Sequence, residues 1–402
     1  MKGWKTYKLE DAVDKLIDYR GKTPQKTTSG IPLVTAKVIK AGRIETPNEF
    51  IAEEMYDEWM TRGIPEYGDV VLTTEAPLGE VAQIRTTEKI ALAQRVITLR
   101  GKKNLIDSTY LKYFLQSPIG QENLKAKETG STVTGIKQSE LRQIEIYAPD
   151  FKTQDSIASI LSSLDNKIEL NLQMNQTLEA MAHAIFKEWF VNFNFPGFGG
   201  KLVNGLPKGW KMGTISEIYK TTSGGTPSRA KDEFYKDGKV KWVKSKELNG
   251  SFIFDTEEKI TDDAVKNSSA KKVPRHSVLI AMYGATVGEY GVLSSEATCN
   301  QAICAIIPND NYPYSYILEY IKINKEKIID QASGSAQQNI SQALIQRQEI
   351  LIPPSEIVKS FHQIVDKLFE RIESNLFSNQ ILAQTRDSLL PNLIAGKLEV
   401  KA

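Results

Sequence analysis

The most constraining feature of this sequence is an internal repeat, in which the first half of the chain returns 204 residues later. The gap-free part of the repeat includes Thr129-Gly130-Ser131, which matches Ser333-Gly334-Ser335. Upstream the match needs only small insertions, as in Gly3-Trp4-Lys5 and Gly209-Trp210-Lys211. Solenoid repeats have periods of about 20 to 50 residues, so each unit here is a domain in its own right. A duplicated chain in turn suggests a duplicated target.

Composition places the chain among globular proteins. Its 402 residues suffice for two cores of ordinary domain size, and 41% hydrophobic with 25% charged residues excludes a disordered chain. No run approaches about eighteen apolar residues, and residues 1–4 lack the apolar core of a signal peptide. We therefore expect a cytoplasmic protein without membrane contact. The net charge of +2 does not by itself suggest nucleic acid.

Motifs for catalysis are missing from the sequence. Gly21-Lys22-Thr23 resembles the end of a phosphate-binding loop, but Leu16 stands where that loop needs a glycine. Pro353-Pro354 has no neighbouring amide or ring to hold a target base. Cys299 and Cys304 have no histidine nearby, so we interpret them as buried apolar residues. The three histidines have no metal-ligand spacing, and the sequence predicts neither an enzyme, nor a metal site, nor a bound cofactor.

Each repeat begins with about 150 residues that indicate an α+β domain. Short β-rich runs lie between turn residues. In the first domain the predicted strands are 70–73, 95–99 and 144–147, and their counterparts in the second are 277–283, 303–307 and 349–352. An amphipathic helix is predicted between the last two strands of each set, over 108–116 and 314–325.

A long helical pattern follows each domain. Apolar residues recur at steps of three and four, and the same seam appears 204 residues later. The first seam comprises Ile157, Leu161, Leu164, Ile168, Asn171, Asn175, Leu178, Ala182, Ile185 and Trp189. Because the seam is narrow and flanked by charge, it favours a coiled coil about 50 Å long over a helix buried in a large core. The layout predicted is domain 1–150, helix 151–192, linker 193–208, domain 209–354, helix 355–395 and tail 396–402.

Both seams carry two asparagines at their midpoint, Asn171 and Asn175 in the first and Asn375 and Asn379 in the second. A buried amide is costly unless it is paired, and two amides pair in only one register. The asparagines therefore predict the register of an antiparallel helix pair within one chain, with a pseudo-twofold axis through its middle. The alternative is a parallel dimer between two chains.

The duplicated layout resembles the specificity subunit of type I restriction-modification systems, and the resemblance covers essentially the whole chain. Its most specific elements are residues 74–80 with their echo at 283–289, the Asn300-Gln301-Ala302 run, and the Gly-Ser turns at 130 and 334. The turns lead through Ala148-Pro149 and Ile352-Pro353 into the long helices.

Several functions are implied by this resemblance rather than by composition. Each domain would be a target-recognition domain for one half of a split site in double-stranded DNA. The paired helices would act as spacer and as docking surface for two methyltransferase subunits, with restriction subunits joining the complex. The methyltransferase would modify adenine at N6 and bind S-adenosylmethionine, so that this chain is the non-catalytic specificity subunit. The alternatives are a stand-alone DNA-binding repressor and a coiled-coil scaffold.

Residues that contact DNA are expected in matched turn-rich loops, where side chains can donate to phosphates or base edges. The candidates in the first domain are Arg20, Lys22, Thr23, Lys37, Lys127, Thr129, Ser131 and Thr134. Those in the second are Thr222, Thr226, Ser228, Arg229, Lys246, Ser333, Ser335, Gln337, Gln338 and Asn339. The alternative for each is a solvated loop. Since domains with different targets should differ where they read bases, the similar segments around the Gly-Ser turns favour phosphate contact or structure.

The surface for a protein partner has weaker signals. Phe186, Phe190 and Leu390 lie off the helical seam. They would either anchor a methyltransferase subunit or pack on this protein's own domains.

Overall fold

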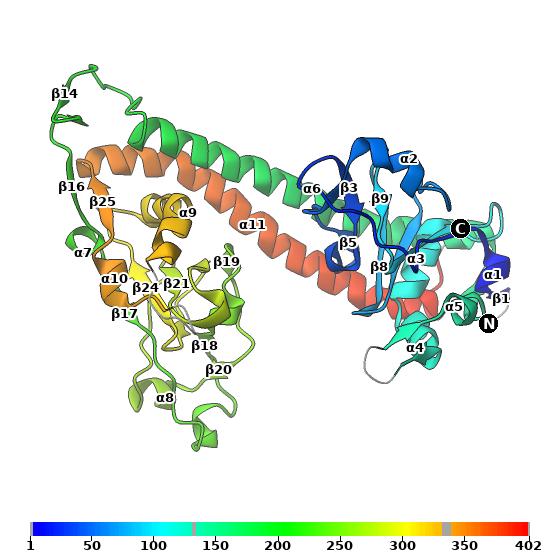
Figure 1. Ribbon diagram of the computed structural model, residues 1–402. Coiled ribbons are helices and arrows are strands. Elements are labelled where there is room, and N and C mark those ends of the chain that lie inside the picture. Colours follow the sequence, from blue (N-terminus) through cyan, green and yellow to red (C-terminus); the bar gives the residue numbers. More distant parts are fainter. Residues whose placement is uncertain (1–2, 131–133, 332–338, 401–402) are drawn as a thin grey trace. The chain divides into compact units, whose positions relative to one another are not determined.

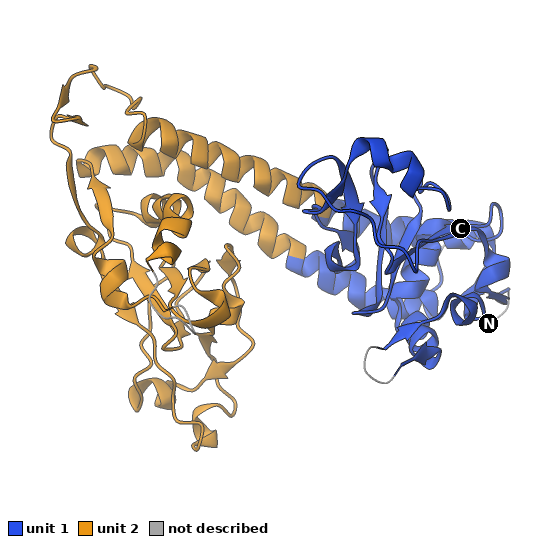
Figure 2. Ribbon diagram, in the orientation of Figure 1, with its two compact units in different colours: residues 1–168, 380–402 blue, residues 169–379 orange. Residues whose placement is uncertain are grey.

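The computed structural model describes residues 3–130, 134–331 and 339–400 (Figure 1). Five predicted DNA contacts lie outside the described residues, namely Ser131, Ser333, Ser335, Gln337 and Gln338. The chain forms two compact units (Figure 2). Unit 1 comprises Met1–Ile168 and Gln380–Ala402, and unit 2 comprises Glu169–Asn379. The long helices are therefore divided between the two units.

Unit 1 is built on an antiparallel sheet with the strand order β2-β10-β7-β8. Its strands are β2 (Val13–Asp18), β10 (Val96–Gly101), β7 (Val70–Thr74) and β8 (Leu78–Gln83). Both faces are buried, because Val70 and Leu72 point into one apolar core while Val71 points into another. The first core also contains α3 (Ser108–Gln116) and the second contains the parallel pair β3 (Ile31–Val34) and β9 (Ala91–Leu92).

Smaller elements complete unit 1. Strand β3 also pairs with β6 (Phe50–Ile51). The others are β1 (Lys5–Lys8), α1 (Leu9–Ala12), β4 (Ile39–Lys40), β5 (Arg43–Ile44), α2 (Tyr56–Trp59), α4 (Pro118–Ala126), β11 (Glu128–Thr129), β12 (Gly135–Ile136), α5 (Gln138–Arg142) and β13 (Glu145–Ala148). Antiparallel pairing of β1 with β13 places the start of the domain beside the strand that leads into the first long helix.

Unit 2 repeats this plan with a five-stranded sheet in the order β17-β24-β21-β22-β19. Its strands are β17 (Lys220–Ser223), β24 (Ile303–Ile307), β21 (Val278–Ala281), β22 (Tyr290–Leu293) and β19 (Phe252–Ile253). The second sheet has the order β20-β18-β23, with β20 (Lys259–Ile260), β18 (Val240–Val243) and β23 (Thr298–Cys299). The parallel pair β18-β23 is the counterpart of β3-β9. The α+β prediction is confirmed in both units.

Smaller elements also complete unit 2. They are the hairpin β14 (Leu202–Val203) and β15 (Leu206–Pro207), then β16 (Lys211–Thr214), α7 (Ile215–Ile218), α8 (Asp262–Lys266), α9 (Tyr314–Asp330), α10 (Gln342–Gln346) and β25 (Glu349–Ile352). Strand β16 pairs with β25 as β1 pairs with β13. The hydroxyl of Tyr316 donates to the Leu351 carbonyl at 2.6 Å, and Tyr110 donates to Tyr147 at 2.7 Å. The two domains share a fold down to this hydrogen bond.

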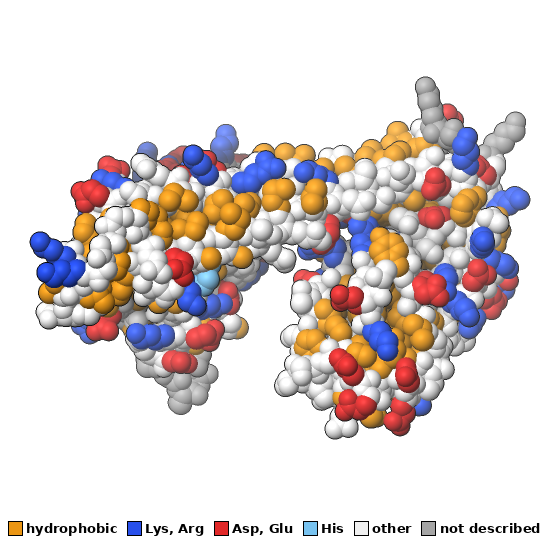
Figure 3. Space-filling view, turned by 90° about the horizontal axis from the view of Figure 1, so that it is seen from above, with side chains coloured by type: hydrophobic (Ala, Val, Ile, Leu, Met, Phe, Trp, Pro, Cys, Tyr) orange, Lys and Arg blue, Asp and Glu red, His pale blue; other side chains and the backbone are white. Residues whose placement is uncertain are grey.

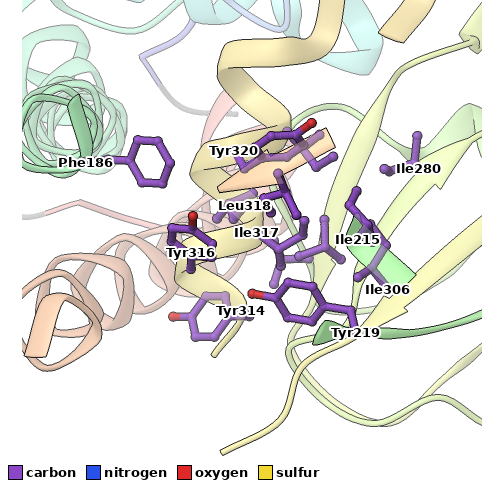
Figure 4. Packing of buried hydrophobic residues seen from close by; sticks show 14 of the residues in the cluster. Phe186, Ile215, Tyr219, Ile280, Ile306, Tyr314, Tyr316, Ile317, Leu318 and Tyr320 are labelled. Atoms are coloured by element: carbon purple, nitrogen blue, oxygen red, sulfur yellow. The ribbon is translucent and has the colours of Figure 1, made fainter. Parts of the chain in front are cut away.

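Aromatic side chains at the end of the first long helix pack into the hydrophobic core of unit 2. Phe186 faces Tyr316 of α9 (Figure 4), with ring centroids 5.6 Å apart. Phe190 packs on Trp210 at 5.8 Å, and Leu390 is buried in the core of unit 1. The three side chains considered for a protein partner thus pack on this protein's own domains.

The two long helices are antiparallel. Helix α6 (Phe151–Phe190) and helix α11 (Ser355–Ile394) have 40 residues each. In unit 2 the Asn171 amide donates to Asn379 at 2.7 Å, and Asn375 donates to Asn175 at 2.8 Å. Because Asn375 and Asn379 repeat Asn171 and Asn175, a local twofold axis exchanges the two hydrogen bonds. Pairing within one chain, rather than a parallel dimer, is what the structure shows.

The control of register by these amides remains a prediction, which stability measurements can test. Each pair makes one hydrogen bond, and within the described residues Asn171 Oδ1, Asn175 Nδ2 and Asn379 Nδ2 have no partner. We expect Asn375→Ala to lower the free energy of unfolding by about 1–3 kcal/mol, because it leaves the Asn175 amide buried without its donor. Replacing both Asn175 and Asn375 with leucine should restore stability or raise it.

Urea unfolding of the full chain provides the measurement. Ser374→Ala is the matched control, since Ser374 is the exposed residue next to Asn375 on the same helix. Its effect should stay within about 0.5 kcal/mol. A double leucine variant less stable than the single alanine variant would contradict this account.

Candidate nucleic-acid interface

Matched loops meet at one edge of the main sheet in each unit. In unit 1, β2 ends and β10 begins at this edge, because Ile97 pairs with Asp18, and β7 ends there because Val96 pairs with Thr73. In unit 2, Ser223 at the end of β17 pairs with Cys304 near the start of β24. The antiparallel order of the strands thus brings loops that are distant in sequence together. Arg20, Lys22 and Thr23 follow the end of β2, and Thr226, Ser228 and Arg229 follow the end of β17.

A threonine and a glutamine form the same contact at this edge in both units. In unit 1 the Thr23 hydroxyl donates to Gln94 Oε1 at 3.4 Å. In unit 2 Thr226 donates to Gln301 Oε1 in the same way. Each threonine lies in the turn after the first strand of the sheet, and each glutamine precedes the central strand. The two contacts are therefore equivalent under the internal repeat.

Backbone hydrogen bonds fix the loop that carries each glutamine. The Ala93 amide donates to the Val34 carbonyl at 3.0 Å, and the Asn300 amide donates to Val243 at 2.9 Å. On the other side of Gln301, the carbonyl of Ala302 accepts from Met282 at 2.7 Å. Because bonds flank this glutamine on both sides, its backbone is held by the sheet and not by the loop alone.

The turn that carries Thr226 needs glycine for close packing. A Cβ on Gly224 would lie 2.2 Å from the Cys299 and Asn300 carbonyl oxygens, and one on Gly225 would lie 2.3 Å from Ser269. The Gly225 carbonyl in turn accepts from the buried Trp242 indole at 3.0 Å. The Gly-Gly-Thr-Pro sequence thus presses this turn against β23 and leaves Thr226 exposed.

The segments after β7 and β21 join the same edge through matched β-bridges. Glu75 bridges to Gly135 in unit 1, and Tyr283 bridges to Asn339 in unit 2. Arg95, next to Gln94, also forms an ion pair of 2.7 Å with Glu75. Thr134 precedes Gly135, which bridges to Glu75, and Glu75 pairs with Arg95 next to Gln94. A chain of contacts therefore links Thr134 to the threonine–glutamine pair.

The predicted basic residues of unit 1 fall into two groups. Lys22 and Lys37 are exposed, and within the described part of the chain neither makes an ion pair. Arg20 instead donates to the Ile136 carbonyl at 2.8 Å, which ties the end of β2 to β12. Lys127 lies 3.3 Å from Glu140, and the Thr129 hydroxyl donates to Gly135 at 3.4 Å. Among the predicted basic residues of unit 1, Lys22 and Lys37 have no ion-pair partner in the described chain and can meet a phosphate without first losing one.

The basic residues predicted in unit 2 already have acidic partners. Arg229 makes two hydrogen bonds to Glu258, of 2.7 and 2.8 Å, and its guanidinium lies over the Tyr235 ring at 4.2 Å. Lys244 also contacts Glu258, and Lys246 lies 2.5 Å from Glu257. Hydrogen bonds from Arg229 and Lys244 lower the pKa of Glu258 to about 2. Acidic and basic side chains are likewise interspersed over the face shown in Figure 3.

Two other residues of unit 2 that were predicted to contact DNA make no long-range side-chain hydrogen bond within the described chain. The Thr222 hydroxyl donates to the neighbouring Ser223 carbonyl, and Ser228 is exposed. Gln94, Gln301 and Lys244 are not among the residues predicted from the sequence to contact DNA. For the two glutamines a signal existed in the repeat itself, because Leu92-Ala93-Gln94 aligns with Cys299-Asn300-Gln301.

Within residues 3–130, 134–331 and 339–400, no cluster of three or more histidine, cysteine or acidic residues could hold a metal ion. Burial raises the pKa of both the Cys299 and the Cys304 thiol to about 12, so both stay protonated. No helix in the described parts of the chain is long and apolar enough to cross a membrane.

Comparison with known proteins identifies the class. The family model for the type I restriction modification DNA specificity domain matches twice, over residues 1–180 and 207–384. The chain therefore belongs to the family of type I restriction-modification DNA specificity domains, and the resemblance predicted from the sequence is confirmed. DNA sequence recognition is the function of this class.

Individual relatives agree with the assignment. The chain is 28% identical over 366 residues to the type I restriction enzyme MjaIX specificity subunit of Methanocaldococcus jannaschii, covering 87% of this chain and 82% of that protein. It is 27% identical over 379 residues to the HindI specificity subunit of Haemophilus influenzae, covering 77% and 82%. In fold it is similar to the crystal structure of an S subunit from M. genitalium, with a TM-score of 0.62 at 15% identity and coverage of 97% and 96%.

Proposed function

We propose that this chain reads a split DNA site, with one half-site for each domain. The observation that carries the proposal is the repeated edge: two domains of one fold present the same loops and the same threonine–glutamine contact. The exposed cations Lys22 and Lys37 support phosphate contact in the first half. Residues that differ between the halves, such as Arg95 with Glu75 and Arg229 with Glu258, are suited to reading different bases.

The helix pair supports a second part of the proposal, the recruitment of partners. The local twofold axis through the four asparagines gives two equivalent faces, which suit two copies of one methyltransferase subunit. That subunit would bind S-adenosylmethionine and methylate adenine at N6, and restriction subunits would join the same complex. The chain itself would contribute recognition without catalysis, in the cytoplasm where it meets cellular DNA.

Methylome mapping tests the proposed function. Cells that express the chain with its cognate methyltransferase should carry methylated adenine in one split motif with a fixed spacer. Deletion of the chain should abolish this methylation. A chain that binds its site tightly without the methyltransferase would instead be a repressor, and a chain that retains no DNA at any salt concentration would be a scaffold.

The length of the helix pair should set the spacer. One heptad inserted after Ile168 and another after Leu382, which are opposite positions in the register of the asparagine pairs, should lengthen the pair by about 10 Å. The spacer of the methylated motif should then grow by about 3 base pairs. A heptad in only one helix is the control and should abolish methylation, because it breaks the register. An unchanged spacer in the double insertion would contradict the idea of a ruler.

A further inference from the structure

The threonine–glutamine pair is a polar side-chain contact that the described parts of the two recognition edges share. The neighbouring residues of the sequence differ: Lys22 and Arg95 stand next to Thr23 and Gln94 in unit 1. In unit 2 Arg229 follows three residues after Thr226 and pairs with Glu258, which also contacts Lys244. In the matched β-bridges, Glu75 pairs with Gly135 in unit 1, whereas Tyr283 pairs with Asn339 in unit 2. Domains that read different half-sites must differ at the residues that specify bases. A contact that is the same in both should therefore meet what the half-sites have in common.

The chemistry of the pair indicates which common feature it meets. Since the threonine hydroxyl donates to Gln Oε1, the amide plane is oriented and the Nε2 group remains available as a donor. A donor without positive charge suits a phosphate oxygen, and glutamine and threonine both make such contacts to DNA. No other side chain is bonded to either Nε2 within the described residues. Gln301 is also exposed, and Gln94 is half-buried.

From these observations we infer that Gln94 and Gln301, oriented by Thr23 and Thr226, bind the DNA backbone at equivalent phosphates of the two half-sites. The pairs position each domain on the duplex, and the unlike residues around them read the sequence. This inference rests on the proposed function, since it assigns a role within the same DNA interface. The backbone bonds that fix the glutamine loops make this contact rigid, as a positioning contact requires.

Binding measurements on the complex with the methyltransferase test the inference. We expect Gln94→Ala and Gln301→Ala each to weaken binding of the cognate duplex about tenfold, the loss of one hydrogen bond to a charged group. Thr23→Val and Thr226→Val should each have a smaller effect in the same direction. The methylated motif should keep every specified base. Gln94→Glu should weaken binding more than Gln94→Ala, because a carboxylate repels phosphate.

Salt dependence separates the glutamines from the cations. A neutral side chain releases no counterions, so the slope of log K against log salt should be the same for Gln94→Ala as for the parent. Lys22→Ala is the matched comparison in the same turn, and its slope should fall by about 1. A motif that becomes degenerate at one base in Gln94→Ala would show base reading and overturn the inference. An affinity within twofold of the parent would overturn it as well.

Measurements on the parent complex distinguish a failure of the proposed function from a failure of the inferred phosphate contact. If the parent methylates no split motif, the proposed function fails before any variant is made. If the parent does so and the glutamine variants behave like it, only the backbone contact is wrong.

Discussion

Replacing Asp165 with alanine should lower the free energy of unfolding of unit 1 by about 3–5 kcal/mol, the usual cost of removing one member of a buried ion pair. Asp165 lies on α6 and accepts three hydrogen bonds. Lys112 Nζ and the Tyr113 hydroxyl of α3 both donate at 2.6 Å, and Arg386 of α11 donates at 2.8 Å. Since the Lys112 side chain is 2% exposed, its charge would be buried without a counterion. One carboxylate thus joins the recognition domain to both long helices.

The loss of stability in Asp165→Ala should depend on pH. Burial alone would raise the pKa of Asp165, but Lys112, Tyr113 and Arg386 together hold it below its usual value. A carboxyl group with a lowered pKa stabilises the fold above its unfolded pKa of about 3.9 and loses that contribution as the pH falls through the folded pKa. The difference between parent and variant should therefore be full near neutral pH and shrink below about pH 4.

Hydrogen exchange of the α3 amides together with urea unfolding would measure this loss. Asp155→Ala is the control, because Asp155 is an exposed carboxylate on the same helix, and its effect should stay within about 0.5 kcal/mol. A loss of less than about 1 kcal/mol in Asp165→Ala would mean that water replaces the carboxylate and that the ion pair is not the main link.

Phe361→Ala should destabilise unit 2 by about 3–5 kcal/mol, through lost burial and the cavity that remains. Phe361 is fully buried at the start of α11. Its ring lies 5.1 Å from Phe190, 5.8 Å from Phe186 and 6.0 Å from Trp189, all at the end of α6. Because edge-to-face contacts add to the free energy of burial, Phe361 should contribute strongly to holding the ends of the two helices together.

Thermal unfolding of the full chain should show this loss in the unit 2 transition. Phe377→Ala is the matched control on the same helix, because Phe377 is 52% exposed and contacts only the Phe254 ring at 5.7 Å in the aromatic contacts of the described chain. Its cost should remain below about 1 kcal/mol. Equal losses in both variants would show that the aromatic core does not carry the helix junction.

Periodic features of the sequence predicted the fold well, because they depend on local geometry. The helix predicted over 108–116 is α3 with those bounds, and the helix predicted over 314–325 extends to Asp330. The long seams predicted antiparallel helices of nearly the observed length. Asn171 and Asn175 meet Asn379 and Asn375 as a paired register requires. Each of these signals lies within one helix or in its exact repeat.

Contacts between loops that are distant in the sequence could not be predicted in this way. Arg229 and Glu258 are 29 residues apart in the sequence. No sequence pattern indicates that Glu258 binds the guanidinium group of Arg229, which was expected to contact DNA. Gln94 meets Thr23 only because the sheet brings its strands into register. From the sequence, Phe186 could contact either a methyltransferase subunit or this protein's own domains. In the structure it packs against Tyr316 of α9. The side-chain contacts of the loops thus depend on tertiary structure, whereas the helices and their register follow from periodic patterns in the sequence.

The division of unit 1 into two stretches affects the order of events during synthesis. Leu390, Leu393 and Ile394 belong to its core, but the ribosome makes them only after all of unit 2. At usual rates of translation the first stretch waits roughly 10 to 45 s for them. Until then, the surface of the α3 core that these residues cover stays open to chaperones and to premature association. Unit 2, in contrast, is one continuous stretch and can fold as soon as it leaves the ribosome. The second recognition domain should therefore mature before the first.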